Sequence, residues 1–452
     1  MVRCTEYNWA VNGFDRDFAG PGDQLLGDGT SSSVYEGRLT IRSGGFFLQE
    51  QIGLGDRFFL TGGVRWDGFS TFGEGFGLAA YPKVAAAYTI SDEAFFPQEI
   101  GIDALKLRGA WGMSGRAPGA FDAVKIYEAT QADEVVPALI IGNLGNADLG
   151  PEVSEEIELG FETSLFDGRA SIDFTYFDQT TRDALIGVPE APSFGTEEAT
   201  LRNLGETTNK GYEAIVNVTP IRTDNLDWNV NFSYSTNESE ITDLGPLEQA
   251  GFNLQLGFPI GVEYDDVVMN PGQVGAAPDV ETQVLGVVFP TQTLAMGTRL
   301  TFAQSLTLDL LAESQMGHVR GIGIGWATAR RETWPHCFGI QNEFNANGSV
   351  NLTPQQVATC VPGRIDWGMW TQNADFIKLR SASLSYRLPD DLVPGTRSVS
   401  IALQGKNLWQ MTDYQGLDPE ATDRGLDRGE YAFEYYNMAP PRIFILNMTV
   451  NF

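Results

Sequence analysis

The chain closes with the stretch Arg442-Ile-Phe-Ile-Leu-Asn-Met-Thr-Val-Asn-Phe452. Large apolar side chains and mostly polar ones take alternate positions, with Phe444, Leu446, Met448, Val450 and Phe452 on one face and Ile445, Asn447, Thr449 and Asn451 on the other. Period two is the repeat of a β-strand. A soluble strand hides its apolar face in a core, whereas a strand of a membrane barrel turns that face to lipid and its polar face to the lumen. We interpret this stretch as the closing strand of a transmembrane β-barrel.

The same alternation recurs through the chain and predicts roughly a dozen strands. It is clearest in four segments, at 58–66, 105–111, 157–176 and 228–236, and the last of these sets Asn and Ser against Trp, Val, Phe and Tyr. Asp167-Gly168 interrupts the third segment, and Asp-Gly between alternating runs is a strong hairpin signal. We expect a tight periplasmic turn there, and long external loops at 115–145 and 332–373.

Several motifs resemble, in order, the barrel segments of SusC/RagA-type TonB-dependent transporters. They are Val64-Arg-Trp-Asp-Gly68, Leu105-Lys-Leu-Arg-Gly-Ala-Trp-Gly-Met-Ser-Gly115, Asn203-Leu-Gly205, Asn209-Lys-Gly-Tyr-Glu213, the segment 374–389, Gly405-Lys-Asn-Leu-Trp409 and Tyr414-Gln-Gly-Leu-Asp-Pro-Glu420. The resemblance runs from about Tyr35 to Phe452 and is poor between 261 and 376. It implies an all-β fold, the carboxy-terminal part of an antiparallel barrel of about 22 strands. We expect residues 1–33 to be a loop or frayed leader and residues 34–452 to be barrel. The family's signal peptide, TonB-contacting motif, plug domain and first strands are not recognisable before Tyr35.

The resemblance also implies a function and partners. Members import oligosaccharides or peptides across the outer membrane, driven by TonB and the proton gradient, with a SusD-like surface lipoprotein as lid. The expected partners of this chain are therefore that lipoprotein, the TonB complex through the missing amino-terminal part, outer-membrane lipid and the barrel-assembly machinery. Phe452 resembles the carboxy-terminal signal that this machinery reads.

Composition narrows the classes of protein. The net charge is −30, which argues against nucleic acid as a partner because phosphate binding needs a basic surface. No run approaches the roughly 18 apolar residues of a membrane helix. Apolar residues reach only 42%, which a barrel tolerates because each strand shows lipid every second residue.

Chemistry-bearing residues are sparse. Cys337 and Cys360 flank a polar, Asn-rich segment, and we expect them to close an external loop as a disulfide. His336 beside Cys337 lacks the four-ligand pattern of a structural zinc site. His318 and His336 are the two histidines, and neither lies in a catalytic motif. We therefore expect no enzyme activity, no catalytic residue, no metal and no cofactor.

Aromatic residues divide into two groups. Those near strand ends are expected to form interfacial girdles, because a membrane interface favours rings with a polar edge: Trp66, Tyr88, Trp111, Tyr176, Tyr234, Tyr386 and Trp409. Those on loops or facing the lumen are the candidates for ligand contact: Trp326, Trp334, Trp367 and Trp370.

Two rival classes stay open from the sequence. A passive porin would share the alternation but lack a plug and energy coupling. A secreted β-sandwich that binds or cleaves glycans would be soluble without detergent and would have a dry apolar core. The Asn-, Ser- and Thr-rich faces opposite the apolar ones favour a wet lumen instead.

Overall fold

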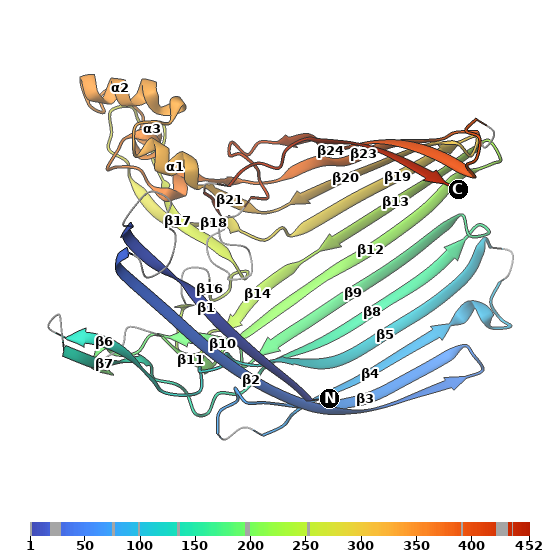
Figure 1. Ribbon diagram of the computed structural model, residues 1–452, viewed down its shortest axis with the longest axis horizontal. Helices are drawn as coiled ribbons and strands as arrows, with labels where there is room; N and C mark the ends of the chain where they lie inside the picture. The colour runs from blue at the N-terminus through green and yellow to red at the C-terminus, as the bar shows by residue number, and fades with distance from the viewer. Residues whose placement is uncertain are drawn as a thin grey trace.

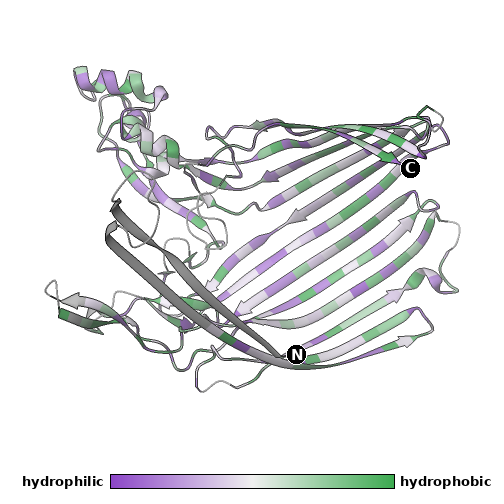
Figure 2. Cartoon of the chain, viewed as in Figure 1, coloured by the Kyte–Doolittle hydropathy of each residue, from purple (hydrophilic) through white to green (hydrophobic). Residues whose placement is uncertain are grey.

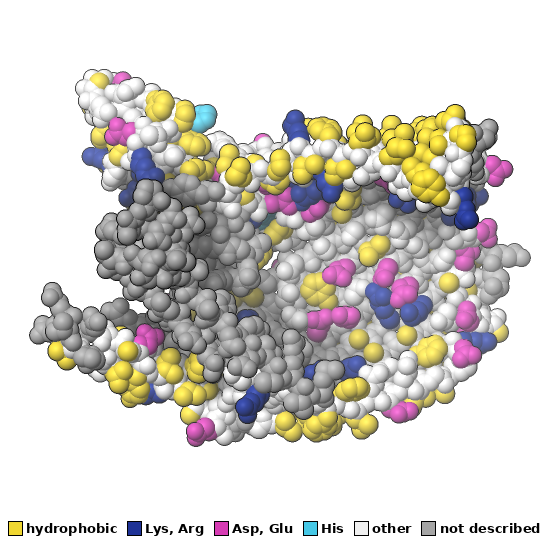
Figure 3. Space-filling model, in the orientation of Figure 1, with side chains coloured by type: hydrophobic (Ala, Val, Ile, Leu, Met, Phe, Trp, Pro, Cys, Tyr) yellow, Lys and Arg dark blue, Asp and Glu magenta, His cyan; other side chains and the backbone are white. Residues whose placement is uncertain are grey.

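A computed structural model describes residues 2–18, 29–74, 77–97, 100–132, 136–194, 199–250, 254–389, 392–421, 433–435 and 437–452. About half of them belong to one strongly curved 15-stranded antiparallel sheet (Figure 1), and its concave side is hollow (Figure 3). In spatial order its strands are β1 (Val2–Phe18), β2 (Gly29–Leu54), β3 (Phe58–Phe69), β4 (Ala79–Thr89), β5 (Ile102–Arg116), β8 (Glu152–Leu165), β9 (Ala170–Arg182), β12 (Glu206–Arg222), β13 (Leu226–Thr236), β19 (Gln292–Phe302), β20 (Leu306–Met316), β23 (Phe376–Arg387), β24 (Ser398–Thr412) and β26 (Ile443–Asn451), with β14 (Glu238–Asp243) on β12 beyond β13.

Most of the remaining elements lie in the longer connections between these strands. They are the pairs β6 (Ile126–Ala132) with β7 (Val136–Asn143), β10 (Leu185–Val188) with β11 (Thr200–Asn203), β15 (Gln249–Ala250) with β16 (Leu254–Gln255) and β17 (Val262–Val268) with β18 (Val280–Val287), and the three-stranded sheet of β21 (Val319–Ile322), β22 (Thr371–Asn373) and β25 (Phe433–Glu434). The helices are η1 (Ile90–Asp92), η2 (Pro192–Phe194), α1 (Gly323–Ala329), η3 (Pro335–Cys337), α2 (Phe338–Asn347), α3 (Pro354–Cys360) and η4 (Trp367–Trp370). None of these described helices has the length and apolar character needed to span a bilayer.

Register gives the large sheet two chemically distinct faces. Tyr386, Ile401 and Met448 lie opposite one another on three successive strands, and the neighbouring positions Ser385, Ala402 and Asn447 form the row that points the other way. Green and purple therefore alternate along most strands in Figure 2. The apolar row is highly exposed, with Phe444 at 69% and Leu446 at 72%. Figure 3 shows acidic and basic side chains inside the hollow and hydrophobic ones over the outer surface at its upper edge. The sheet thus reverses the arrangement of a soluble protein, because its apolar face is on the outside, where it needs contact with lipid.

Ring side chains with polar edges mark the outer face near the strand ends. Trp111 Nε1 donates to Glu155 Oε1 at 2.8 Å, and Trp228 Nε1 donates to Thr298 Oγ1 at 2.8 Å. Tyr234 donates its hydroxyl to Gln292 Oε1 at 3.2 Å. Each ring keeps an apolar body beside the lipid face and a satisfied polar tip, as an interfacial position requires.

The predicted hairpin at Asp167-Gly168 is confirmed, because β8 and β9 pair from Val153 with Arg182 to Leu165 with Ala170. Asp167 and Gly168 both have positive φ, 58° and 71°, which Gly adopts freely and Asp tolerates. Their backbone N–H groups donate to the carboxylate of Asp103 at the start of β5.

The structure corrects three expectations about loops. Residues 2–18 form β1, which pairs with β2, so this part of the expected leader is a strand; Tyr7, Trp9 and Val11 do alternate in the sequence with small or polar residues. The expected loop at 115–145 contains the hairpin of β6 and β7. The expected loop at 332–373 contains α2, α3, η3 and η4, whose helical turns are too short to show a helical period in sequence.

These last helices belong to a compact rim module, which we define as residues 319–373, between β20 and β23 (Figure 1). Its core holds Ile322, Ala329 and Trp370, all nearly inaccessible to solvent. Thr353 caps α3 in a capping box with Gln356, with Pro354 in the first turn. Cys337 and Cys360 are joined by a disulfide, with their Cα atoms 5.2 Å apart.

A bulge interrupts the wall beneath the rim module. On β23, Leu379 lies opposite Ala312 and Ser381 opposite Leu311, so Arg380 is an extra residue. On β24, Asn407 has φ of 53°, a left-handed conformation that Asn tolerates, at the register shift of that strand against β23. The motif Gly405-Lys-Asn-Leu-Trp409 is thus a structural bulge. Because one residue is added to β23, Lys378 above it and Ser381 below it both face inward.

Candidate ligand-binding cavity

Fixed charges line the concave face of the sheet. Arg108 on β5 donates to Glu162 on β8 at 2.8 Å and to Asp173 on β9 at 2.6 Å, and Lys106 pairs with the same Glu162 at 3.1 Å. Arg108 also donates to Thr175 Oγ1 at 2.5 Å. The bonds hold these side chains flat against the wall, so the hollow presents ordered charges at this point.

Further along the face, amides and hydroxyls replace charges. Asn231 Nδ2 donates to Asn217 Oδ1 at 2.7 Å, and Asn217 Nδ2 donates to Ser171 Oγ at 3.2 Å. These three residues come from three adjacent strands and occupy one inward row. Such a chain of neutral donors and acceptors is a hydrated lining, consistent with the wet lumen expected from the sequence.

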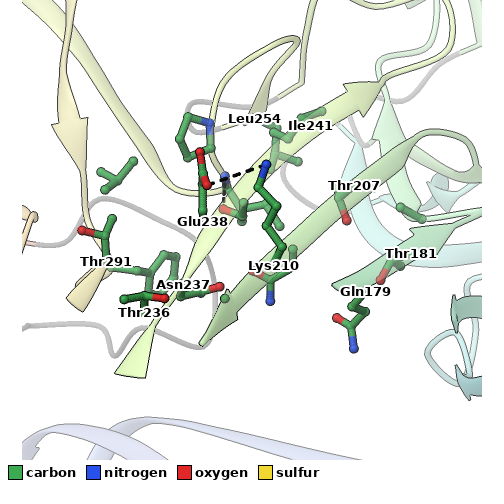
Figure 4. Close-up of a pocket in the computed structure, with 18 of the residues that line it drawn as sticks. Gln179, Thr181, Thr207, Lys210, Thr236, Asn237, Glu238, Ile241, Leu254 and Thr291 are labelled. Atoms are coloured by element: carbon green, nitrogen blue, oxygen red, sulfur yellow. Dashed lines mark hydrogen bonds and ion pairs between the residues drawn. The ribbon is translucent and has the colours of Figure 1, made fainter. Parts of the chain in front are cut away.

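A pocket of about 1040 Å³ opens where β13 gives way to β14 and where β19 begins (Figure 4). Its polar lining includes Arg116, Gln179, Thr207, Asn209, Lys210, Asn237, Glu238 and Gln292, and its apolar lining includes Ile186, Ile241, Leu244, Leu254, Ile260 and Val287. Ile241 and Leu244 are part of a packed apolar cluster, which gives the pocket a firm aliphatic floor. A volume of this size fits ligand cavities rather than packing defects.

Several polar groups at this pocket are free to bind a ligand. The Oδ1 atom of Asn209 is buried and has no hydrogen-bond partner. Lys210 Nζ and Glu238 Oε2 lie 3.7 Å apart with both side chains largely exposed, so their pairing is weak and easily exchanged for ligand contacts (Figure 4). In contrast, Gln179 Nε2 is engaged at 2.6 Å with Glu156 Oε2. The pocket thus offers unpaired amide and charged groups beside aliphatic ones.

At the top of β23 lies a second feature, the fastening cluster, defined as Glu313, Lys378, Arg380, Asp418 and Glu420. Lys378 Nζ contacts Asp418 Oδ1 at 2.7 Å and Glu420 Oε2 at 2.5 Å, with Lys378 only 7% exposed and Asp418 4%. Arg380 donates to Glu420 from both terminal nitrogens and to Glu313 at 3.0 Å through Nε. Bidentate arginine pairs of this kind are among the strongest ionic contacts.

The loop at 414–420 is held from its other side as well. Arg320 Nε donates to the carbonyl of Pro419 at 2.9 Å, and Glu434 accepts the backbone N–H groups of Leu417 at 2.8 Å and Asp418 at 3.2 Å. Burial raises the pKa of Glu434, and these two donors together with Arg320 oppose that rise. This loop is the motif Tyr414-Gln-Gly-Leu-Asp-Pro-Glu420, whose acidic residues bind the wall while Arg320 of the rim module binds its backbone.

The four tryptophans predicted as ligand contacts are brought together in the rim module. Trp326 and Trp367 meet edge to face at 5.5 Å between centroids, and Trp334 and Trp370 do so at 5.9 Å. Trp370 is only 4% exposed, and Arg330 stacks 4.5 Å from the ring centroid of Trp326. They contact one another and the module core; contact with a ligand stays a prediction.

Sequence reasoning missed the pocket and the fastening cluster. In the sequence, Asn209 and Lys210 stand out only as part of a family motif, and no pattern separates them from other polar residues of a wall strand. Lys378 lies 40 residues before Asp418, so only the fold brings the two together. The sequence did contain one signal for this cluster. Lys378 and Arg380 alternate with Ile377 and Leu379, which indicates a pair of charged side chains on the inward face.

A curved antiparallel sheet with an apolar exposed outside and a polar, charged inside defines the wall of a transmembrane β-barrel. Residues 5–408 match the family model of the TonB dependent receptor-like β-barrel, and the chain belongs to this family.

Two relatives carry the comparison further. The chain is 23% identical to TonB-dependent receptor P26 of Formosa agariphila over 97% of its own length and 49% of the relative's. It is 24% identical to TonB-dependent receptor SusC of Bacteroides thetaiotaomicron over 57% of this chain and 26% of SusC. The chain thus spans about half the length of this TonB-dependent receptor P26.

A solved structure confirms the fold at low identity. The structure described as the RagAB peptide transporter superposes with a TM-score of 0.78 over 99% of this chain and 55% of that chain, at 19% identity. At this identity the likeness supports the fold alone. It agrees with a barrel wall of the SusC/RagA kind.

Proposed function

We propose that this chain supplies barrel wall and external loops to an outer-membrane importer that takes up oligosaccharides or peptides with energy from TonB. The observation that carries the proposal is the pocket at the β13–β14 junction, because a merely structural wall has no need of a roomy recess with unpaired Asn209 and weakly paired Lys210 and Glu238. The mechanism is gated transport, in which ligand binding involves no covalent step.

The partners follow from the family. SusC and a RagAB peptide transporter are among the similar proteins, which supports a SusD-like surface lipoprotein and TonB coupling as partners of the whole protein. We further propose that Phe452, which is 82% exposed beyond the end of β26, is read by the barrel-assembly machinery. The tryptophans of the rim module, Trp326, Trp334 and Trp367, stay candidates for contact with ligand where their rings reach the surface.

The pocket permits either ligand class but for different reasons. Its amide and hydroxyl groups suit sugar hydroxyls and peptide bonds equally. Its aliphatic floor suits an apolar amino-acid side chain, whereas sugars stack on aromatic rings. A direct comparison of the two ligand classes is therefore part of the test.

The test uses the native full-length protein in its own outer membrane. Cells take up a fluorescent peptide pool or a fluorescent oligosaccharide pool, and the protein is then extracted in detergent so that co-purifying chains can be identified. We expect that one of the two pools is taken up and that this uptake depends on TonB. We also expect a lipoprotein to co-purify with the protein. Uptake that persists without TonB would favour a passive porin, and a protein soluble without detergent would favour a secreted β-sandwich.

A matched pair of variants links uptake to the pocket. Asn237 is exposed at the break between β13 and β14 and lines the pocket, so Asn237→Trp fills part of it. Asn347→Trp adds the same ring at an exposed position on α2, away from the pocket. We expect the first variant to reduce uptake at least about tenfold, because losing about 1.4 kcal/mol of binding free energy weakens binding tenfold. We expect the second variant to leave uptake unchanged. Equal uptake in both would remove the pocket from the pathway.

A further inference from the structure

A buried carboxyl without a counter-charge lies between the β17–β18 hairpin and η4. Glu263 on β17 is 2% exposed. Its Oε1 accepts a hydrogen bond from Trp367 Nε1 at 3.0 Å, and its Oε2 is buried without any hydrogen-bond partner. A buried ionised carboxylate with one donor is costly, because desolvation of the charge is left uncompensated.

The groups around Glu263 add to this cost. Asp265 and Asp266 lie on the same strand, and Asp366 precedes Trp367; burial raises the pKa of Asp265 and of Asp366, and their neighbouring carboxylates raise each further. Asp266 Oδ1 accepts the hydroxyl of Thr282 on β18 at 2.6 Å. We call the contact between the β17–β18 hairpin and the η4 region the hairpin seam, and define it as Glu263, Asp265, Asp366 and Trp367.

Among the residues that the structure describes, no cation lies within ion-pair distance of these carboxylates. The other strand of the hairpin contributes Glu281, exposed, and α3, which also packs on β17, contains no charged residue. The nearest basic residue in sequence, Arg364, stacks 5.4 Å from the ring centroid of Phe344. Within the described part of the chain no three acidic, histidine or cysteine side chains converge as a metal site requires. A proton is therefore the species that neutralises Glu263.

We propose that Glu263 acts as a proton-operated clasp, which holds the β17–β18 hairpin against η4 when protonated and releases it when ionised. Burial raises the pKa of Glu263 to about 7, the Trp367 indole lowers it and Asp265 raises it. The carboxyl of Glu263 thus changes its charge near neutral pH, within the range of pH values found outside bacterial cells.

The direction of the pH effect follows from the raised pKa. In the packed seam the carboxyl binds a proton more tightly than in the opened seam, where the pKa is the ordinary one near 4.5. The packed seam is therefore most stable below about pH 5. Between about pH 5 and about pH 7 the equilibrium constant for opening rises roughly tenfold per pH unit, and above about pH 7 it no longer changes. The neighbouring aspartates act in the same direction.

The release is confined to the seam. The rim module keeps its own core and the Cys337–Cys360 disulfide, so opening moves the hairpin and leaves α1, α2 and α3 packed. The inference does not depend on the proposed transport activity. Its consequence is that the shape of the external rim depends on the acidity of the surroundings.

Hydrogen exchange measured by mass spectrometry on the detergent-solubilised full-length protein tests the clasp. Protection factors, corrected for intrinsic exchange, are compared at pH 5.5 and pH 8 for peptides covering 262–268 and 366–370. We expect the wild type to lose protection by roughly tenfold or more between the two pH values. Glu263→Gln keeps the acceptor for Trp367 but cannot ionise, so only the neighbouring aspartates still titrate and the loss of protection should be much smaller than in the wild type.

Two further variants make the result decisive. Glu281→Gln removes an exposed carboxyl from the same hairpin and should behave as wild type. Trp367→Phe removes the donor that stabilises the ionised form, so the midpoint of the loss should move to higher pH, a shift that a purely structural role would not produce. Equal protection of the wild type at pH 5.5 and pH 8, or an undiminished loss in Glu263→Gln, would overturn the proposal.

Discussion

Two buried ionic groups contact the rim module, one through Arg320 and the other through Trp367, and their buried charges are compensated in opposite ways. The fastening cluster sets Lys378 and Arg380 against three carboxylates at bonding distance, and Arg320 lies nearby. The hairpin seam has three carboxyls and one indole donor with no cation. Charge-matched burial fixes a loop at all ordinary pH values, whereas unmatched burial makes packing depend on a proton. Burial alone therefore does not show whether an ionic group stabilises a contact at every pH or makes it depend on pH. The charges of the partner side chains decide this.

The largest effect is expected from breaking the matched group. Lys378→Met leaves Asp418 and Glu420 without their shared cation, and an uncompensated buried charge costs about 3–5 kcal/mol. Hydrogen exchange across 414–420 should rise sharply. The double variant with Asp418→Leu should recover part of the loss, because removing both partners is far less costly than removing one. A double variant as unstable as the single one would contradict the ionic explanation.

The disulfide comes next, since it joins η3 to α3 inside the rim module that lies beside both groups. Replacing both Cys337 and Cys360 by Ser opens a loop with a sequence separation of 23, which costs about 3 kcal/mol by the chain-entropy relation. Exchange in α2 and α3 should increase, while exchange at 414–420, which is tied to the wall, should not. Reduction of the wild type with dithiothreitol provides the control, and increased exchange at 414–420 on reduction would show that the two regions are not independent.

A smaller shift sharpens the description of the seam. Asp265→Asn removes the like charge near Glu263 and preserves the oxygen that accepts the Asp266 N–H at 2.7 Å. The midpoint of the pH-dependent opening should fall by up to about one pH unit, equivalent to about 1.4 kcal/mol. Asp309→Asn, on the barrel wall, serves as the control. A midpoint that stays in place would show that desolvation alone sets the ionisation of Glu263.

The smallest effect is expected from an exposed pair. Arg57 and Glu93 lie 3.3 Å apart at the opposite end of the sheet, with side-chain exposures of 46% and 26%. Arg57→Gln should change stability by less than about 1 kcal/mol, because solvent screens the pair and its geometry costs side-chain entropy. Thermal melting in detergent at low and high salt would measure it. A change as large as that of Lys378→Met would mean that burial is not what distinguishes the ionic groups.

The sequence predicted the wall of the molecule well and its rim poorly. Alternation at 442–452 and at 157–176 predicted β26 and the β8–β9 hairpin, because a wall strand meets lipid on one side and water on the other along its whole length. The helices of the rim module have seven, ten and seven residues and pack on several sides, so no such alternation exists. Thr353, Pro354 and Gln356 did carry a readable capping signal for α3.

The site residues were predictable only in kind. The sequence showed inward polar residues and a tryptophan group, but whether Trp370 faces solvent or a core depends on segments far along the chain. Glu263 and its neighbours looked like any acidic loop, since a charge of −30 makes carboxylate clusters common. Their burial and the lack of a cation are properties of the packed structure.

The extra residue at Arg380 also bears on how this wall can change over time. Side chains above and below it keep their correct faces only because one residue stands outside the ladder. Deleting Arg380 itself would leave Leu379 and Ser381 on their present faces, whereas deleting one residue from the regular stretch 382–386 would turn the side chains on one side of the deletion to the wrong face. Substitutions there are open to natural variation, whereas changes of length are expected in pairs of residues or in the loops.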